Sequence, residues 1–133
     1  MFDLDQSRQL LLMAAAVHNL GPELGSRDRF GANAFKVVRQ ALHWAGLYEG
    51  EVRAAFERYE ESPEVTAFYD ALVSMMPQGN AVEPLFEGEG NLCGKPRASP
   101  FFTHCRLTDR GWVAANQLLQ LHPTYRQNLW QSG

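Results

Sequence analysis

The sequence predicts a mainly α-helical domain that carries one small β-hairpin. Apolar residues recur at helical spacing in five separate stretches, and capping residues precede several of them. One aromatic and β-favouring segment, residues 100–107, leads directly into the last of these helices. The chain has 133 residues, of which 45% are hydrophobic and 20% charged. We therefore expect a single domain over residues 1–133 with a core of its own.

The first three helices are expected over residues 5–20, 33–45 and 51–61. Asp5 and Asn33 are expected to cap the first two, because their side-chain oxygens can accept a backbone N–H of the first turn. Each helix has an apolar stripe on one face. In the first helix this stripe is formed by Leu10, Met13, Ala14 and Val17.

The fourth helix has the clearest start in the chain. Ser62 offers a capping hydroxyl, Pro63 suits the first helical position, and Glu64 places a carboxylate in the first turn. We expect this helix to run to about Met76, with an apolar stripe that is buried in the core.

A β-hairpin is expected after the fourth helix. Residues 81–87 form a candidate edge strand, since Pro84 cannot donate a ladder hydrogen bond, and residues 100–107 form its partner. The glycine-rich residues 88–99 would then lie at the tip of the hairpin.

The closing helix is expected to begin after Thr108, whose hydroxyl can cap the first turn. Gly111 costs helix stability there, and close approach to the preceding strand would explain it. A stripe of residues at helical spacing is predicted for this helix, and Pro123 ends the run. The stripe comprises Trp112, Ala115, Leu118, Leu119 and His122.

The pattern Leu107-Thr108-x-x-Gly111, which leaves a strand and opens a helix, resembles the passage from the wing into the closing helix of winged helix-turn-helix domains. The resemblance implies a winged-helix-like fold with four helices, a hairpin, and one or two C-terminal helices. It also implies a DNA-binding function, in which the wing contacts phosphates and the helix before the wing reads bases.

The formal net charge of −3 is unevenly distributed. Residues 49–89 contain ten acidic residues against Arg53 and Arg58, whereas residues 90–133 contain five basic residues against one acidic residue. Electrostatic steering of a partner would therefore differ between an acidic middle and a basic C-terminal third.

Four basic residues are candidate phosphate contacts: Lys95, Arg97, Arg106 and Arg110. The helix before the predicted wing, residues 63–76, has no Lys or Arg to form the usual fork to guanine. The lack of basic residues on this helix weakens the support for DNA binding. The four basic residues could equally form a solvated surface.

An acidic stripe crosses the end of the third helix and the start of the fourth: Glu57, Glu60, Glu61 and Glu64. Clustered carboxylates can hold Mg²⁺ or Ca²⁺, but no calcium-loop pattern is present. A solvated face, or a patch that meets a basic partner, is the favoured interpretation.

The C-terminal tail, residues 123–133, is a candidate contact with a protein partner or a second copy of the chain. Tyr125, Leu129 and Trp130 are the candidate interface residues there, because Tyr and Trp are enriched at interfaces. A tail that folds back on its own domain is the alternative.

Little in the sequence indicates a catalytic site or a metal site. Cys93, His104, Cys105 and His122 lack the close paired spacing of zinc ligands, and no nucleophile motif surrounds either cysteine. We therefore expect no metal, no cofactor and no enzymatic activity. With only two cysteines, the chain is expected to reside in the reducing cytoplasm, although a Cys93–Cys105 disulfide is an open alternative. No apolar run is long enough to cross a membrane.

The sequence thus favours a non-enzymatic regulatory or adaptor module that binds another protein through its acidic helices or its aromatic tail. The alternative is a winged-helix DNA-binding regulator that contacts phosphates through the wing and the basic C-terminal third.

Overall fold

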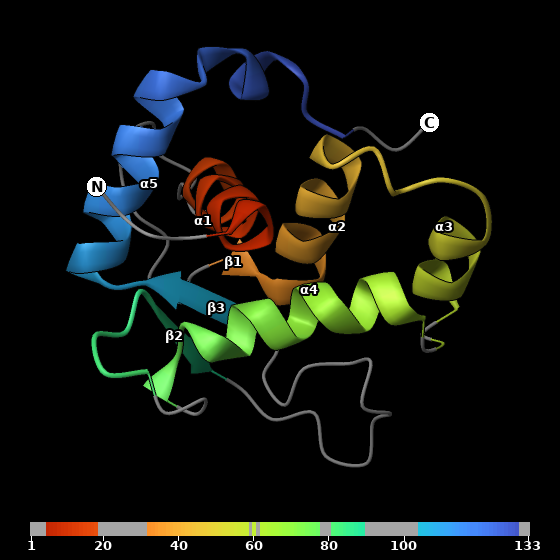
Figure 1. The fold of residues 1–133 in the computed structure, drawn as a ribbon, viewed down its shortest axis with the longest axis horizontal. Coiled ribbons are helices and arrows are strands. Elements are labelled where there is room, and N and C mark those ends of the chain that lie inside the picture. Colours follow the sequence, from red (N-terminus) through yellow and green to blue (C-terminus); the bar gives the residue numbers. More distant parts are fainter. Residues whose placement is uncertain are drawn as a thin grey trace.

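The computed structural model describes residues 5–18, 32–58, 60, 62–77, 81–89 and 104–130. These residues form a mainly helical fold with a small antiparallel hairpin, which confirms the predicted class (Figure 1). The helices are α1 (Gln6–His18), α2 (Ala34–Trp44), α3 (Gly50–Glu57), α4 (Pro63–Ser74), α5 (Asp109–Leu121) and the 3-10 helix η2 (Pro123–Gln127). The strands are β1 (Ala32–Asn33), β2 (Phe86–Glu89) and β3 (His104–Leu107).

Helix α1 lies at the centre of the fold, with α2 and α5 on either side and α4 across it (Figure 1). Every residue from Leu10 to Ala16 is buried. The predicted single apolar stripe was therefore too narrow, and Val17, its last member, is only half-buried. A helix that is apolar all round is buried all round, and here α2, α4, α5, β1 and β3 contact it.

The predicted caps at the starts of α1, α2 and α4 are confirmed. The Asp5 carboxylate accepts the Arg8 N–H at 3.0 Å, and the Asn33 side chain accepts the Lys36 N–H at 3.2 Å. The Ser62 hydroxyl accepts the Val65 N–H at 3.3 Å, with Pro63 at the first helical position. These bonds satisfy backbone donors that have no partner within the helix.

Two helices end earlier than the sequence predicts. Helix α3 ends at Glu57 rather than near residue 61, and α4 ends at Ser74 rather than near Met76. Met76 is nevertheless fully buried, as expected, because the chain turns inward after α4 and the Met75 carbonyl accepts the backbone N–H groups of Leu85 and Phe86.

The hairpin pairs Phe86 with Leu107 and Glu89 with His104. Strand β2 begins later than expected, after Pro84 instead of before it, and lies at the edge of the sheet as predicted. The sheet has a third strand that the sequence did not predict, since β1 pairs with β3 and gives the order β1-β3-β2. Of the predicted partner strand, residues 100–103 lie outside the described residues, as does most of the predicted loop.

The junction between β3 and α5 is built around Thr108. Its hydroxyl accepts the Gly111 N–H at 3.1 Å, which confirms the predicted cap, and donates to the Pro84 carbonyl at 2.7 Å. Gly111 is in close contact as expected, but the backbone beside it belongs to Leu85 and not to the preceding strand. Helix α5 ends at Leu121, so His122, the last residue of the predicted stripe, lies exposed at the C-cap.

Candidate functional site

A groove of about 470 Å³ lies between α3 and the start of α4. Apolar side chains of α3 form part of its lining, with Ala55 buried and Val52 half-buried. Four charged side chains also line the groove, and three of them are acidic. The full lining is Glu51, Val52, Ala54, Ala55, Arg58, Glu60, Ser62, Pro63 and Glu64. We call this feature the α3–α4 groove.

The α3–α4 groove carries an excess of negative charge. The carboxylate of Glu60 pairs with the guanidinium of Arg58 at 3.1 Å, and both side chains are largely exposed. Within the part of the chain that the structure describes, neither Glu51 nor Glu64 has a basic partner. Two carboxylates are therefore available to a positively charged ligand.

The predicted acidic stripe is divided by the structure. Glu60 and Glu64 line the α3–α4 groove, Glu57 does not, and Glu61 lies outside the described residues. Glu51 was missed by the sequence interpretation, which followed helical spacing across one helix end. Helix α3 packs beside α4, and the groove between them is lined by carboxylates from both helices.

Glu57 belongs to a separate cluster on the far side of α3. It accepts the Arg53 guanidinium at 2.9 Å and the Tyr48 hydroxyl at 3.1 Å. The hydrogen bond from Arg53 lowers the pKa of the Glu57 carboxyl, and burial raises the pKa of the Tyr48 hydroxyl. Glu57 therefore has partners within the chain and holds the Tyr48 ring in place.

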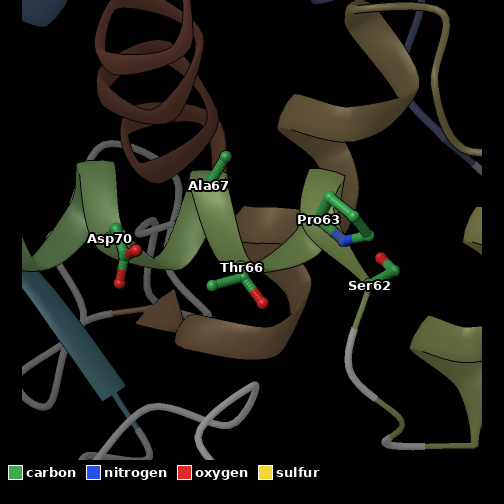
Figure 2. Close-up of a pocket in the computed structure, with 5 residues that line it drawn as sticks. All are labelled: Ser62, Pro63, Thr66, Ala67 and Asp70. Atoms are coloured by element: carbon green, nitrogen blue, oxygen red, sulfur yellow. The ribbon is translucent and has the colours of Figure 1, made fainter.

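A second, shallow hollow of about 440 Å³ follows the outer side of α4. Figure 2 shows its five lining side chains spread along the helix from Ser62 at one end to Asp70 at the other. It shares Ser62 and Pro63 with the α3–α4 groove, so the two depressions adjoin. Asp70 is its one charged lining residue, which makes the exposed side of α4 acidic as predicted.

Two of the four candidate phosphate contacts form ion pairs within the chain. Arg106 pairs with Glu87 across the hairpin at 2.7 Å, and Arg110 pairs with Glu83 at 3.1 Å. All four side chains are partly or largely exposed, so these pairs are screened by solvent. Lys95 and Arg97 lie outside the described residues.

The described part of the C-terminal tail, residues 123–130, folds back on its own domain, the alternative that the sequence left open. The Tyr125 ring packs against Trp44 at a centroid distance of 5.1 Å, and the Trp130 ring packs against Tyr48 at 5.6 Å. Leu129 is 38% exposed. A role of these three residues in contacting a partner stays a prediction.

Metal-binding and reactive groups are sparse in the part of the chain that the structure describes. Among the described residues, no three His, Cys, Asp or Glu side chains gather in a way that could hold a metal ion. Cys105 is a free and fully buried thiol, and burial raises its pKa to about 12. Cys93 lies outside the described residues. No described helix has both the length and the apolar character needed to cross a bilayer.

Comparison with known proteins finds no matching family model, no matching curated protein and no matching solved structure.

Proposed function

We propose that this protein is a non-enzymatic adaptor or regulatory module that binds a basic segment of another protein in the α3–α4 groove. The observation that carries the proposal is the pair of carboxylates, Glu51 and Glu64, that lack a basic partner among the described residues beside an apolar lining. Complementary charge across an interface favours encounter and selects the partner.

A Lys or Arg side chain matches both properties of the groove. Its aliphatic stem can lie along Val52 and Ala55 while its charged end stays near Glu51 or Glu64. Arg58 already pairs with Glu60 in the groove, so a basic side chain of the ligand would compete with Arg58 for that carboxylate. This competition favours a segment with more than one basic residue.

The test measures binding of a labelled peptide that alternates Lys and Leu, with a Glu–Leu peptide of equal length for comparison. The intact protein should bind the basic peptide, and binding should weaken as salt is added. The double substitution Glu51→Gln and Glu64→Gln should weaken binding by about 2- to 30-fold, since each exposed ion pair contributes about 0.2–1 kcal/mol.

Glu49→Gln is the matched control, because Glu49 is an exposed carboxylate that precedes α3 and does not line the groove. Equal losses in the control and in the double variant would indicate general charge attraction and not a site. Absence of binding to the basic peptide at low salt would also overturn the proposal.

A second candidate function is that of a winged-helix DNA-binding regulator. The hairpin that leads through the helix cap Thr108 into α5 supports the winged-helix assignment, which is itself a proposal. The basic C-terminal third would contact phosphates. Helix α4, without Lys or Arg, and the pairing of Arg106 and Arg110 with carboxylates weigh against it.

Titration with mixed-sequence duplex DNA at low and high salt tests this second candidate. DNA binding should be salt-sensitive, and Glu83→Gln should strengthen it by releasing Arg110. Tight DNA binding that Arg110→Ala weakens would favour the regulator over the adaptor. Absence of DNA binding by both the intact chain and Glu83→Gln would exclude it.

A further inference from the structure

The chain after α5 crosses to α2 and lies along it, although the two helices are far apart in the sequence. In Figure 1 the blue C-terminal end passes over the top of α1 and reaches the orange helix α2. We call residues 123–130 the C-terminal strap. Its interactions with α2 are specific and few, and they fall into two groups.

The first group holds Trp130. The Arg39 guanidinium lies 3.8 Å from the centre of the Trp130 ring, and the Tyr48 ring meets it edge-on at 5.6 Å. The Trp130 backbone N–H donates to the Gln40 side-chain oxygen at 3.0 Å. A cation over the face of an indole and an aromatic edge beside it form a site suited to tryptophan. We call Arg39, Gln40 and Tyr48 the Trp cradle.

The second group lies one turn further along α2. The Trp44 indole N–H donates to the Asn128 carbonyl at 2.7 Å, and the His43 ring lies 3.3 Å from the Asn128 side-chain oxygen. Tyr125 packs on Trp44. These interactions hold η2, through the Tyr125 ring, and the three residues after it against the C-terminal half of α2.

The strap provides a hydrogen-bond partner for only one of the two polar groups of the Gln40 side chain. Its side chain is 1% exposed, and its oxygen faces both the Trp130 N–H and the His18 ring at 3.2 Å. A backbone N–H can only donate, so the oxygen must point toward Trp130. The amide nitrogen of Gln40 then has no acceptor among the described residues, although it is buried. The strap therefore leaves a buried donor in the Trp cradle unused.

The strap itself contributes little to the core. No residue of η2 is buried, and Asn128 and Leu129 are exposed. Trp130 and Tyr125 are half-buried, and they pack against the outside of the core cluster. Because the strap is held by a few separate contacts, its release is expected to cost less free energy than opening of the core.

We infer that the α2 face is a binding site for a tryptophan-bearing segment, and that the strap is its occupant within the chain. A partner segment that carries Trp and places a carbonyl or carboxylate at the free Gln40 donor competes with the strap. This surface goes beyond the proposed function, since the Trp cradle shares no residue with the α3–α4 groove.

The test uses a labelled peptide with the sequence of residues 121–133 and the full-length chain carrying Trp130→Ala. This variant should bind the peptide saturably, and the intact chain should bind it at least about tenfold more weakly, because its own strap fills the site. A peptide in which the position of Trp130 is Ala should not bind. Amide NMR shifts should locate the peptide on α2.

Two further variants separate the Trp cradle from general effects. Arg39→Ala, added to Trp130→Ala, should weaken peptide binding, because it removes the cation over the ring. Arg126→Ala is the matched control, because the Arg126 side chain lies on the strap and is exposed. A chain with this substitution alone should bind the peptide as weakly as the intact chain does.

If Trp130→Ala fails to fold, Trp130→Phe keeps a ring in the Trp cradle and should give intermediate peptide binding. Failure of folded Trp130→Ala or Trp130→Phe to bind the peptide would overturn the inference. Equal binding by the intact chain and Trp130→Ala would overturn it as well, since the strap would then not occupy the site.

Discussion

Gly111 in the first turn of α5 lies directly against the carbonyl group of Leu85, the residue before β2. A Cβ atom at position 111 would overlap the Leu85 carbonyl oxygen and would lie 3.1 Å from the Leu107 side chain. The same carbonyl accepts the Thr108 N–H at 3.1 Å, so the Leu85 peptide cannot move away without breaking that bond. The hairpin and α5 are joined at this point by backbone contact.

Gly111→Ala should therefore destabilise the protein by about 1–3 kcal/mol, since the added methyl group forces a backbone shift in a packed region. The measurement is the free energy of unfolding in urea. Val113→Ala is the control, because Val113 lies on α5 and is 53% exposed. The expectation fails if both substitutions have the same effect.

Thr108→Ala should cost about 1–2 kcal/mol of stability, the range for loss of a helix cap. The hydroxyl both accepts the Gly111 N–H and donates to the Pro84 carbonyl, so both partners lose a bond. Thr108→Ser retains the hydroxyl and should keep most of the stability. A Ser variant as unstable as the Ala variant, in thermal or urea unfolding, would show that the hydroxyl is not the cause.

His18 should make folding stability depend on pH. Burial lowers its pKa below the usual 6.5, and Lys36 and Arg39 add to the effect, while its bond to Gln40 opposes it. The unfolded chain then binds a proton more readily than the folded chain. The contribution of His18 to the free energy of unfolding is fully present above pH 6.5. It decreases as the pH falls through 6.5 toward the lower pKa of the folded state.

The comparison is between the intact chain and His18→Gln, with unfolding free energy measured from neutral pH down to mildly acidic pH. The variant should show a weaker decrease on acidification. His122→Gln, at the exposed end of α5, should behave as the intact chain. Identical pH profiles for the intact chain and His18→Gln would refute the role of His18.

Cys105 should be chemically inert in the folded protein, because its thiol is fully buried and its pKa is raised to about 12. In a Cys93→Ser background, alkylation by iodoacetamide should be slow for the native chain and fast in urea. Mass spectrometry gives the labelled fraction. Rapid native labelling would mean that β3 opens readily.

Local signals allowed much of the fold to be predicted. The side chains of Asn33, Ser62 and Thr108 each accept a hydrogen bond from the backbone N–H three residues further along the chain. The starts of these helices could therefore be predicted from neighbouring residues. Strand β1 could not, because its two residues pair with a strand in the last third of the chain, and nothing near them indicates it. The burial of every side of α1 was equally hidden, since it depends on several elements that pack around the helix.

The candidate sites were less predictable than the fold. Helical spacing identified Glu60 and Glu64, but Glu51 joins them only through the packing of α3 beside α4. Arg106 and Arg110 were expected as candidate phosphate contacts, and their carboxylate partners became visible only when the chain was folded. The partners of Tyr125 and Trp130 on and beside α2 likewise depend on long-range packing.

The enclosure of α1 has a consequence for how the protein opens. Its backbone amides from Leu10 to Ala16 are shielded by neighbours on all sides, so no partial fluctuation of one surface helix brings solvent to them. Deuterium should enter these amides only when the whole domain comes apart. Their exchange rates would then report the global unfolding equilibrium, while those of the strap would report a far smaller opening.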